Sequence, residues 1–477
     1  MKTLQHYIAG RFVAPATDGG RFAVINPATE AQVAEILMGG AADVDHAVAA
    51  AHAAFPGWAA TPLALRIACL ERLLAVFERR YAEMVDAITT EMGAPYDLSH
   101  DSQAQCGPGH IKATIAAALE LDWEVRSGAR GAVVREPVGV CGLITPWNWP
   151  MNQVAAKVAP ALLAGCTVVL KPSEQSPLSA ALFAEFIDEA GVPAGVFNMV
   201  HGTGPAVGHA LVAHPGVDMV SFTGSTRAGI SIAKTAADAV KRVAQELGGK
   251  SPNIVFADAD LESAVRRGVR HCFGNSGQSC NAPTRMLVED SVYERAVGLA
   301  VAAGAAVQVG DPTKKGNHIG PVSSKMQFDK IQRCIEQGIA EGARLVLGGP
   351  GRPEGFEHGY YVRPTIFADV DNRMSIARDE IFGPVLALLR FATPEEAVAI
   401  ANDTPYGLAA YVQTQDLDKA RRVARLLRAG SVYLNGAGQD FCSPFGGFKQ
   451  SGNGREWGKY GLLEYLELKA INGYYAA

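Results

Sequence analysis

Cysteine and charge are sparse in this sequence. Eight cysteines among 477 residues form no C-x-x-C pair, so neither a disulfide framework nor a zinc ribbon is indicated. Reduced thiols in the cytoplasm are the expectation. Charged residues make up 19% of the chain, the net charge is -5 and no basic stripe occurs, which makes nucleic acid and anionic membranes poor candidate partners.

Long apolar runs are also missing. No stretch reaches the roughly 18 apolar residues that a membrane helix needs. Residues 154–170 come closest, but Lys157 and Pro160 interrupt them. The start, "MKTLQHYIAGRFV", lacks the apolar segment and cleavage pattern of a signal peptide. We therefore expect a soluble protein.

The hydrophobic content of 48% is enough for a large core, and its pattern predicts an α/β fold. Residues 41–120 are predicted to be helical. Short β-rich runs then alternate with helices: 167–173 precede a helix at 177–190, and 219–225 precede one at 227–238. A second series of strands runs from 285–290 to 431–436. Such alternation favours two domains with mainly parallel sheets, joined near 246–252, whereas 118–137 and 463–475 are predicted strands outside either series.

Glycine-rich turns offer candidate phosphate sites. "HGTGPAVG" (201–208) has one residue too many for the dinucleotide fingerprint, while "FTGSTRAG" (222–229) follows a strand and opens a helix, as a pyrophosphate site requires. An ordinary strand–turn–helix glycine is an equally good interpretation.

"KPSE" (171–174) follows another predicted strand. Glu174 could accept hydrogen bonds from ribose hydroxyls and would repel a 2′-phosphate, which favours NAD over NADP. The alternative is a helix start with Ser173 as its N-cap.

Three further residues suit covalent catalysis. Asn148 in "ITPWNWP" could donate its amide to an oxyanion, or could simply belong to a turn. Glu246 in "QELGGKSP" could be a half-buried general base, or a solvated residue at a helix C-terminus. Cys280 in "GNSGQSCNAP" has small, polar neighbours, unlike Cys69 and Cys166 in their apolar runs, which suits a nucleophile. No Cys–His pair is evident, and a histidine such as His271 is more often structural.

Together, these motifs resemble the NAD(P)-dependent aldehyde dehydrogenase superfamily. "ITPWNWP", "KPSE", "FTGST", "ELGGKSP", "GQSC", "EIFGPV" (380–385) and "PFGGFKQSGNGRE" (444–456) occur in the family's order and spacing, and the resemblance runs from about residue 7 to the end. It implies an atypical Rossmann cofactor domain, an α/β catalytic domain and a small β oligomerisation element. The implied ranges are 1–117 and 138–248 for NAD binding, 249–447 for catalysis, 448–465 for a return segment, and 118–137 with 466–477 for assembly.

The resemblance also implies the chemistry. An aldehyde would be oxidised to a carboxylic acid through a thiohemiacetal and a thioester on Cys280, with Asn148 and the Cys280 N–H holding the oxyanion and Glu246 activating water. Lys157 would lie near the active site, in a proton relay. The implied cofactor residues are Ile144, Thr145, Trp147, Lys171, Ser173, Glu174, Gly204, Phe222, Gly224, Ser225, Leu247, Gly248, Glu380 and Phe382. The cofactor would be NAD, with NADP possible, and no metal is required.

The substrate pocket departs from the family's usual pattern. Ala156 stands where several members carry a bulky aromatic, which predicts a wider wall, and Ser279 and Asn281 make the pocket partly polar. With Trp149 and Phe441 as the other substrate residues, a medium-chain, aromatic or semialdehyde-type substrate is expected.

Three alternatives and the assembly complete the hypothesis. A coenzyme A-acylating semialdehyde dehydrogenase would lack the general-base glutamate, a non-catalytic member would lose the nucleophile, and a thiol hydrolase would leave "KPSE" and "FTGST" without a role. A cytoplasmic dimer or tetramer, paired through strands at 118–137 and 463–475, is implied.

Overall fold

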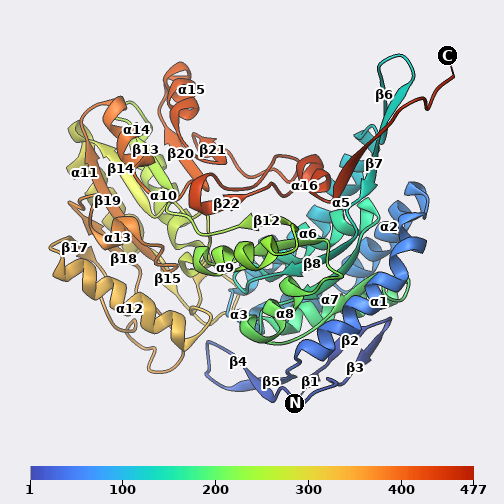
Figure 1. The fold of residues 1–477 in the computed structure, drawn as a ribbon. Helices are drawn as coiled ribbons and strands as arrows, with labels where there is room; N and C mark the ends of the chain where they lie inside the picture. The colour runs from blue at the N-terminus through green and yellow to red at the C-terminus, as the bar shows by residue number, and fades with distance from the viewer. Residues whose placement is uncertain (1, 477) are drawn as a thin grey trace.

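Two large sheets lie side by side, each covered by helices on both faces (Figure 1). The structure is a computed structural model that describes residues 2–476. Residues 1 and 477, which end the outermost predicted ranges, lie outside the described part.

The first sheet has eight strands and is parallel through its centre. In spatial order its strands are β22 (Gly452–Asn453), β12 (Arg242–Glu246), β11 (Met219–Thr223), β8 (Val140–Ile144), β9 (Thr167–Lys171), β10 (Phe197–Met199), β2 (His6–Ile8) and β3 (Arg11–Val13). Pairing is parallel from β12 to β10 and antiparallel at both edges. We call it the cofactor sheet.

The strands of the cofactor sheet are apolar on both faces because helices cover both. In β8, Val140 and Ile144 join the hydrophobic cluster on one face, while Cys141 and Leu143 join the cluster on the other. This alternation follows from the two-residue period of a strand. The covering helices are α1 (Ala41–Ala59), α2 (Leu63–Arg79), α3 (Tyr81–Met92), α5 (Cys106–Glu120), α6 (Pro150–Ala164), α7 (Pro177–Glu189), α8 (His209–Ala213) and α9 (Thr226–Ala237).

Short helical turns connect these elements. They are α4 (Tyr96–Leu98), η1 (Ser99–Gln103) and η2 (Gly204–Gly208). Within the predicted helical range 41–120, the stretch before Gly93 forms two separate helices, α2 and α3, because the chain turns at Arg80. Gly93 ends α3 with φ of 72°, a conformation that favours glycine.

The second sheet has seven strands and contains the predicted second series. Its strands, in spatial order, are β17 (Arg344–Leu347), β18 (Thr365–Ala368), β19 (Val385–Phe391), β14 (Arg285–Glu289), β13 (Pro252–Val255), β20 (Ala409–Gln413) and β21 (Ser431–Leu434). Only the edge strand β17 is antiparallel to its neighbour. The surrounding elements are α10 (Leu261–Phe273), η3 (Gly274–Gly277), η4 (Asp290–Val292), α11 (Tyr293–Ala305), α12 (Lys325–Ala340), α13 (Ser375–Arg378), α14 (Pro394–Asn402), α15 (Leu417–Leu426) and η5 (Lys449–Ser451).

A third, antiparallel sheet projects from the molecule beside the C-terminus (Figure 1). It contains β6 (Glu124–Ser127), β7 (Gly131–Pro137) and β23 (Leu466–Ile471). Both predicted strand segments began too early, because α5 continues to Glu120 and α16 (Gly458–Glu464) fills the start of the second. The apolar patterns there belong to helix ends that precede the strands.

Small sheets complete the fold. They pair β1 (Lys2–Leu4), β5 (Gln32–Leu37) and β4 (Arg21–Ile25), and β15 (Gln308–Val309) with β16 (His318–Ile319). Across residues 2–476, no helix is both long and apolar enough to cross a membrane.

Candidate active site

A cleft opens where strands of the cofactor sheet end. It has a volume of about 200 Å³ and lies at the carboxyl ends of β8, β11 and β12, the edge where open α/β sheets bind ligands. The predicted cofactor residues that line it are Trp147, Gly224, Ser225, Leu247, Gly248, Glu380 and Phe382. Sequence reasoning missed Gln327 and Lys330, which lie on α12 and reach this cleft from the side of the second sheet.

The cleft fits a dinucleotide. Ser225 caps α9 by accepting the Ala228 N–H (3.3 Å), and an N-terminus of this kind binds phosphate. A Cβ at Gly248 would lie 2.6 Å from the Glu380 carboxyl, and one at Gly224 would lie 2.5 Å from the ring of Phe222. Glycine thus keeps the cleft open at both positions.

The remaining predicted cofactor residues lie outside the lining of this cleft. They are Ile144, Thr145, Lys171, Ser173, Glu174, Gly204 and Phe222. Lys171 ends β9 and donates to Glu174 (2.9 Å), so both occupy the carboxyl edge of the sheet. The alternative reading of "KPSE" as a helix start is wrong, because α7 begins later, after Ser176.

Cys280 follows a strained loop that ends α10. Asn275 and Ser276 have φ of 54° and 55°, in the region that L-residues seldom adopt. The Asn275 amide donates to the carbonyls of Asn148 (2.9 Å) and Gln278 (3.2 Å). These bonds hold the cysteine loop against the loop after β8, a fixed spacing that catalysis at Cys280 would need.

Asn148 lies beside this loop. Its side chain is 4% exposed, and its amide donates to the Gln278 carbonyl (3.1 Å). An amide has two hydrogens, so one remains for a ligand in the cleft. The residue therefore belongs to a structured turn and also lines the cleft, so the turn does not rule out the predicted role as an oxyanion donor.

Glu246 ends β12 and is 3% exposed. The alternative of a solvated glutamate at a helix C-terminus is wrong, since the chain is extended here and pairs with β11 and β22. Neither carboxyl oxygen has a hydrogen-bond partner among the described residues. Burial, and secondarily the charge of Glu456, raises the pKa of Glu246 well above its usual value.

The Cys280 thiol is also held protonated. Burial raises its pKa, and the carboxylates of Glu246 and Glu380 raise it further, while the backbone N–H groups of Cys280 and Asn281 oppose them. Cys280 lies on a turn, is partly exposed, and lines both the cleft and a second cavity.

Lys157 lies deeper, on α6. Its ammonium pairs with the Glu456 carboxylate and donates to Ser221 Oγ (3.1 Å). Lys157 does not line either cavity, but its positive charge lowers the pKa of Glu246, opposing the charge of Glu456, which raises it.

A second cavity, of about 250 Å³, meets the cleft at Cys280; we call it the substrate cavity. Of the predicted substrate residues, Trp149, Ser279 and Asn281 line it. Phe441 stands behind that lining and packs on Trp457, with ring centroids 5.7 Å apart. Residues that sequence reasoning missed are Leu98, Cys106, Asn152, Gln153, His271, Gly274, Asn275, Gln439, Phe445 and Trp457.

The expected widening at Ala156 is wrong. Ala156 is 3% exposed and is packed in a cluster with Phe445 and Trp457, whose rings stack at 4.5 Å. The C-terminal segment supplies the aromatic wall that the small residue at 156 lacks. Nothing in the sequence indicated this wall, because only the fold brings Trp457 next to Ala156.

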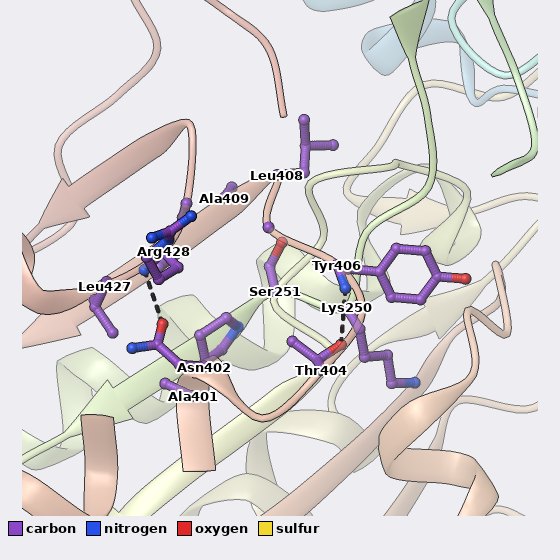
Figure 2. A pocket seen from close by; sticks show the side chains of 14 residues that line it. Lys250, Ser251, Ala401, Asn402, Thr404, Tyr406, Leu408, Ala409, Leu427 and Arg428 are labelled. Atoms are coloured by element: carbon purple, nitrogen blue, oxygen red, sulfur yellow. Dashed lines mark hydrogen bonds between the residues drawn. The ribbon is translucent and has the colours of Figure 1, made fainter. Parts of the chain in front are cut away.

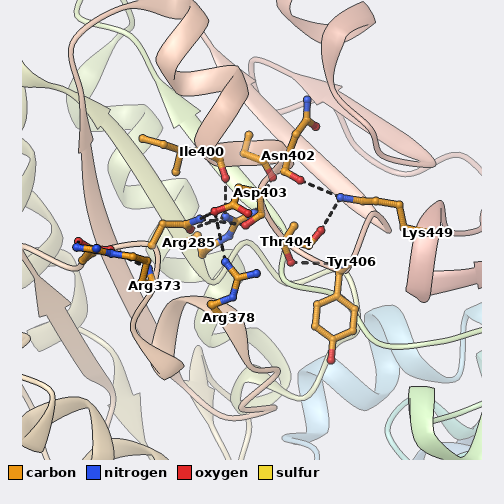
Figure 3. Close-up of polar contacts among 12 residues, drawn as sticks. Arg285, Arg373, Arg378, Ile400, Asn402, Asp403, Thr404, Tyr406 and Lys449 are labelled. Carbon is orange, nitrogen blue, oxygen red and sulfur yellow. Dashed lines mark hydrogen bonds and ion pairs between the residues drawn. The ribbon is translucent and has the colours of Figure 1, made fainter.

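Two buried cations, Lys250 and Arg285, and the exposed Lys449 lie behind the loop at 249–251. Lys250 and Ser251 border a small cavity of about 10 Å³ beside the loop around Thr404 and Tyr406 (Figure 2). Next to it, Arg285 donates to the carbonyls of Ile400 (2.9 Å) and Ala401 (2.9 Å) at the end of α14, and Lys449 donates to Asn402 and Thr404 (Figure 3). Cations at a helix C-terminus are favourable, so these residues fix the segment that backs the active site.

Comparison with known proteins decides the family. The sequence pattern of the aldehyde dehydrogenase family matches residues 12–471. The chain belongs to the aldehyde dehydrogenase family. It is 55% identical to a 3-succinoylsemialdehyde-pyridine dehydrogenase from Pseudomonas sp over 472 residues, which covers 98% of each chain.

Solved structures agree with this family assignment. The crystal structure of an aldehyde dehydrogenase from Bartonella henselae superimposes with a TM-score of 0.97 at 52% identity, covering 99% of this chain and 100% of the other. A cysteine-to-alanine mutant of aldehyde dehydrogenase C from Pseudomonas syringae, complexed with NAD+ and octanal, gives a TM-score of 0.98 at 51% identity, covering 99% and 97%. The predicted aldehyde dehydrogenase fold is confirmed. The protein is an NAD(P)-dependent aldehyde oxidoreductase, and structures of its relatives, among them a betaine aldehyde dehydrogenase from Staphylococcus aureus, have been solved in complex with NAD+.

Proposed function

We propose that Cys280, Asn148 and Glu246 carry the oxidation of an aldehyde to a carboxylic acid. The observation that supports this most directly is that Cys280 is shared by the cofactor cleft and the substrate cavity. A nucleophile at that junction can hold an aldehyde carbon within reach of both.

The residues divide the reaction into covalent steps. The Cys280 thiol releases its proton to water as its sulfur adds to the aldehyde carbon, and the resulting oxyanion accepts hydrogen bonds from the Asn148 amide and the Cys280 N–H. The residues of the cleft would hold NAD, whose nicotinamide would supply the hydride acceptor for that carbon. Water then attacks the Cys280 thioester and gives a proton to Glu246, which releases the acid and restores the thiol.

A Cys280→Ala variant tests this assignment. It should bind NAD with the wild-type affinity by calorimetry and should release no NADH with any aldehyde. NADH production at the wild-type rate would refute the catalytic role of Cys280.

Lys157 is proposed as a positioning residue in a proton relay through Glu456. The supporting observation is their buried ion pair and the influence of both charges on Glu246. Lys157→Met should shift the ascending limb of the kcat–pH profile to higher pH, because a positive charge that favours ionised Glu246 is lost. An unshifted profile would exclude the relay.

We propose that the eight-stranded sheet is the core of the NAD-binding domain, residues 1–117 and 138–248, with 249–447 as the catalytic domain. Cofactor preference is proposed to rest on Glu174, whose charge disfavours a 2′-phosphate. The lining of the cleft from both sheets supports a cofactor held between them. Steady-state kinetics with NAD and NADP tests the preference.

The proposed substrate is an aldehyde with an aromatic end and an oxo group. Trp149, Phe445 and Trp457 give the substrate cavity aromatic walls, while Asn152 gives it an amide. A relative at 55% identity is a 3-succinoylsemialdehyde-pyridine dehydrogenase, a semialdehyde enzyme. An NADH-release screen across straight-chain, aryl and aryl-oxo aldehydes tests the proposal, and activity confined to acetaldehyde-sized substrates would overturn it.

Deacylation is proposed to use water rather than coenzyme A. Glu246 ends β12 directly before Leu247 and Gly248, which line the cofactor cleft, and the acylating alternative lacks this group. Product analysis with and without coenzyme A distinguishes an acid from a coenzyme A thioester.

Assembly through the projecting sheet is proposed. β23 carries Leu468, which is 66% exposed, and the tail carries the exposed Tyr474, so apolar surface is open there. Solution scattering should give a dimer or tetramer, and deletion of 466–477 should shift it to a monomer.

A cytoplasmic location is proposed from the cysteines. All eight are unpaired in the structure, as expected in a reducing compartment. Cell fractionation tests the location.

A further inference from the structure

Asn152 occupies a distinctive position in the substrate cavity. It lies in the first turn of α6, and its Oδ1 is 2.7 Å from Nε2 of His110 on α5. His110 is 2% exposed, and its ring is 4.7 Å from that of Phe441 and 5.4 Å from that of Trp457. Three segments of the chain therefore meet behind one amide.

The His110 ring fixes the direction of this amide. Burial lowers the pKa of His110 to about 4, so the ring is neutral in any ordinary assay. A neutral ring with its proton on Nε2 donates to Asn152 Oδ1, which leaves the amide NH₂ of Asn152 facing away from His110. That NH₂ has no hydrogen-bond partner among residues 2–476, although Asn152 lines the cavity.

Two other polar groups of the cavity already have protein partners, whereas the buried Oε1 of Gln153 is an acceptor without one. The Ser279 hydroxyl accepts from Trp149 Nε1 (2.8 Å), and the Asn281 carbonyl accepts from the Tyr411 hydroxyl (2.9 Å). Gln153, the next residue, lines both the cofactor cleft and the substrate cavity, whereas Asn152 lines the substrate cavity alone. The NH₂ of Asn152 therefore belongs to the part of the substrate cavity that is not shared with the cofactor cleft, where the body of a bound substrate would lie.

We propose that Asn152, held by His110, is a specificity residue that donates a hydrogen bond to an oxo oxygen carried by the substrate away from its aldehyde group. The proposal rests on the proposed function and adds the residue that reads the oxo group. His110 is the positioning residue, because it acts only through Asn152. A substrate without the oxygen displaces the water that would otherwise solvate this half-buried NH₂ and offers no acceptor in its place, which lowers the affinity for that substrate.

The test uses two aldehydes of equal length, an aryl-oxo aldehyde and its deoxygenated counterpart. The quantity measured is the ratio of their kcat/KM values, oxo over deoxo, for purified enzyme with saturating NAD. Asn152→Leu should lower this ratio about tenfold. Asn152→Asp, which keeps the bond from His110 but presents an oxygen to the cavity, should lower it at least as much and guards against a misfolded leucine variant.

Variants of His110 separate positioning from packing. His110→Phe removes the donor and should lower the ratio toward that of Asn152→Leu, whereas His110→Gln, which can still donate to Asn152, should retain most of it. The wild-type ratio should not change between pH 6 and 9, the range in which roughly all of His110 is neutral. Gln439→Leu removes a different amide from the same cavity and should leave the ratio within about twofold of wild type.

The outcomes are distinguishable. If neither aldehyde is oxidised, the proposed substrate class fails. If both are oxidised and Asn152→Leu or Asn152→Asp keeps the wild-type ratio, or Gln439→Leu lowers it equally, the substrate class stands and the role of Asn152 is overturned. If His110→Phe keeps the ratio, His110 does not position Asn152.

Discussion

Replacing Glu246 with glutamine should separate the two halves of the reaction. The substitution keeps the size of the side chain and removes its ability to accept a proton. Because neither carboxyl oxygen has a protein partner, the change breaks no hydrogen bond within the described residues, and the fold should tolerate it. Loss of a general base typically costs about 10²- to 10⁴-fold in rate.

That loss should fall on deacylation alone. The first turnover needs Cys280, Asn148 and NAD, so Glu246→Gln should release about one NADH per active site in a fast burst and then slow by at least about a hundredfold. Rapid-mixing absorbance of NADH measures both phases. Added hydroxylamine, a nucleophile that needs no base, should restore part of the steady-state rate.

The pH dependence gives a second readout. Since the pKa of Glu246 is raised, the ionised base becomes more abundant as pH rises, and wild-type deacylation should accelerate from neutral to alkaline pH. Glu246→Gln should lose this acceleration. Glu289→Gln is the matched control, because Glu289 likewise ends a parallel strand, β14, but the residues next to it in the sequence line neither cavity, whereas Leu247 and Gly248 beside Glu246 line the cofactor cleft. A variant in which burst and steady state fall together would refute a late role for Glu246.

Three further predictions follow from other parts of the molecule. Glu174→Ala frees the Lys171 ammonium and removes a repelling charge, so kcat/KM for NADP relative to NAD should rise about tenfold in steady-state kinetics, and an unchanged ratio would exclude Glu174 as the discriminator. Gly277→Ala should cost at least about 3 kcal/mol in chemical unfolding, because φ is +74° and a Cβ would overlap the Gly383 carbonyl. Gly191→Ala, with φ of +69° and open space, should cost only about 1 kcal/mol, and equal costs would refute the clash. Burial lowers the pKa of His110 to about 4, so its contribution to stability is complete above its unfolded pKa of 6.5 and is lost as pH falls toward 4. His110→Gln should remove about 3 kcal/mol of this pH dependence from the free energy of unfolding, measured by denaturant titration at several pH values. Identical pH profiles for the two proteins would contradict this.

The strand–helix order could be predicted from the sequence because it depends on local periodicity. Buried parallel strands such as β9 and β19 are short apolar runs between helices, and their bounds differ from the expectation by a few residues at most. The strands after Leu121 and Tyr465 were placed too early, since the apolar residues at the ends of α5 and α16 continue into them.

The residues of the candidate site also differ in whether local sequence could predict them. Cys280, Glu246 and Asn148 stand next to glycine or proline turns, a signal that short motifs carry, and all three lie where the two sheets meet. Asn152 and His110 are ordinary helix residues that are 42 positions apart in the sequence. Nothing local indicates their contact, which forms only because α5 packs against α6. Trp457 was missed for the same reason.

The edge strand β22 has a consequence for biosynthesis. Gly452 pairs with Glu246 across more than 200 residues, and the Ser451 carbonyl accepts the Leu247 N–H (3.0 Å). A chain leaving the ribosome from its N-terminus can assemble the centre of the cofactor sheet early, because β8 to β12 are contiguous in sequence. The strand that encloses the proposed base is among the last segments to emerge. Until then the β12 edge stays unpaired, and a nascent chain that already binds nucleotide would still lack the wall beside Glu246.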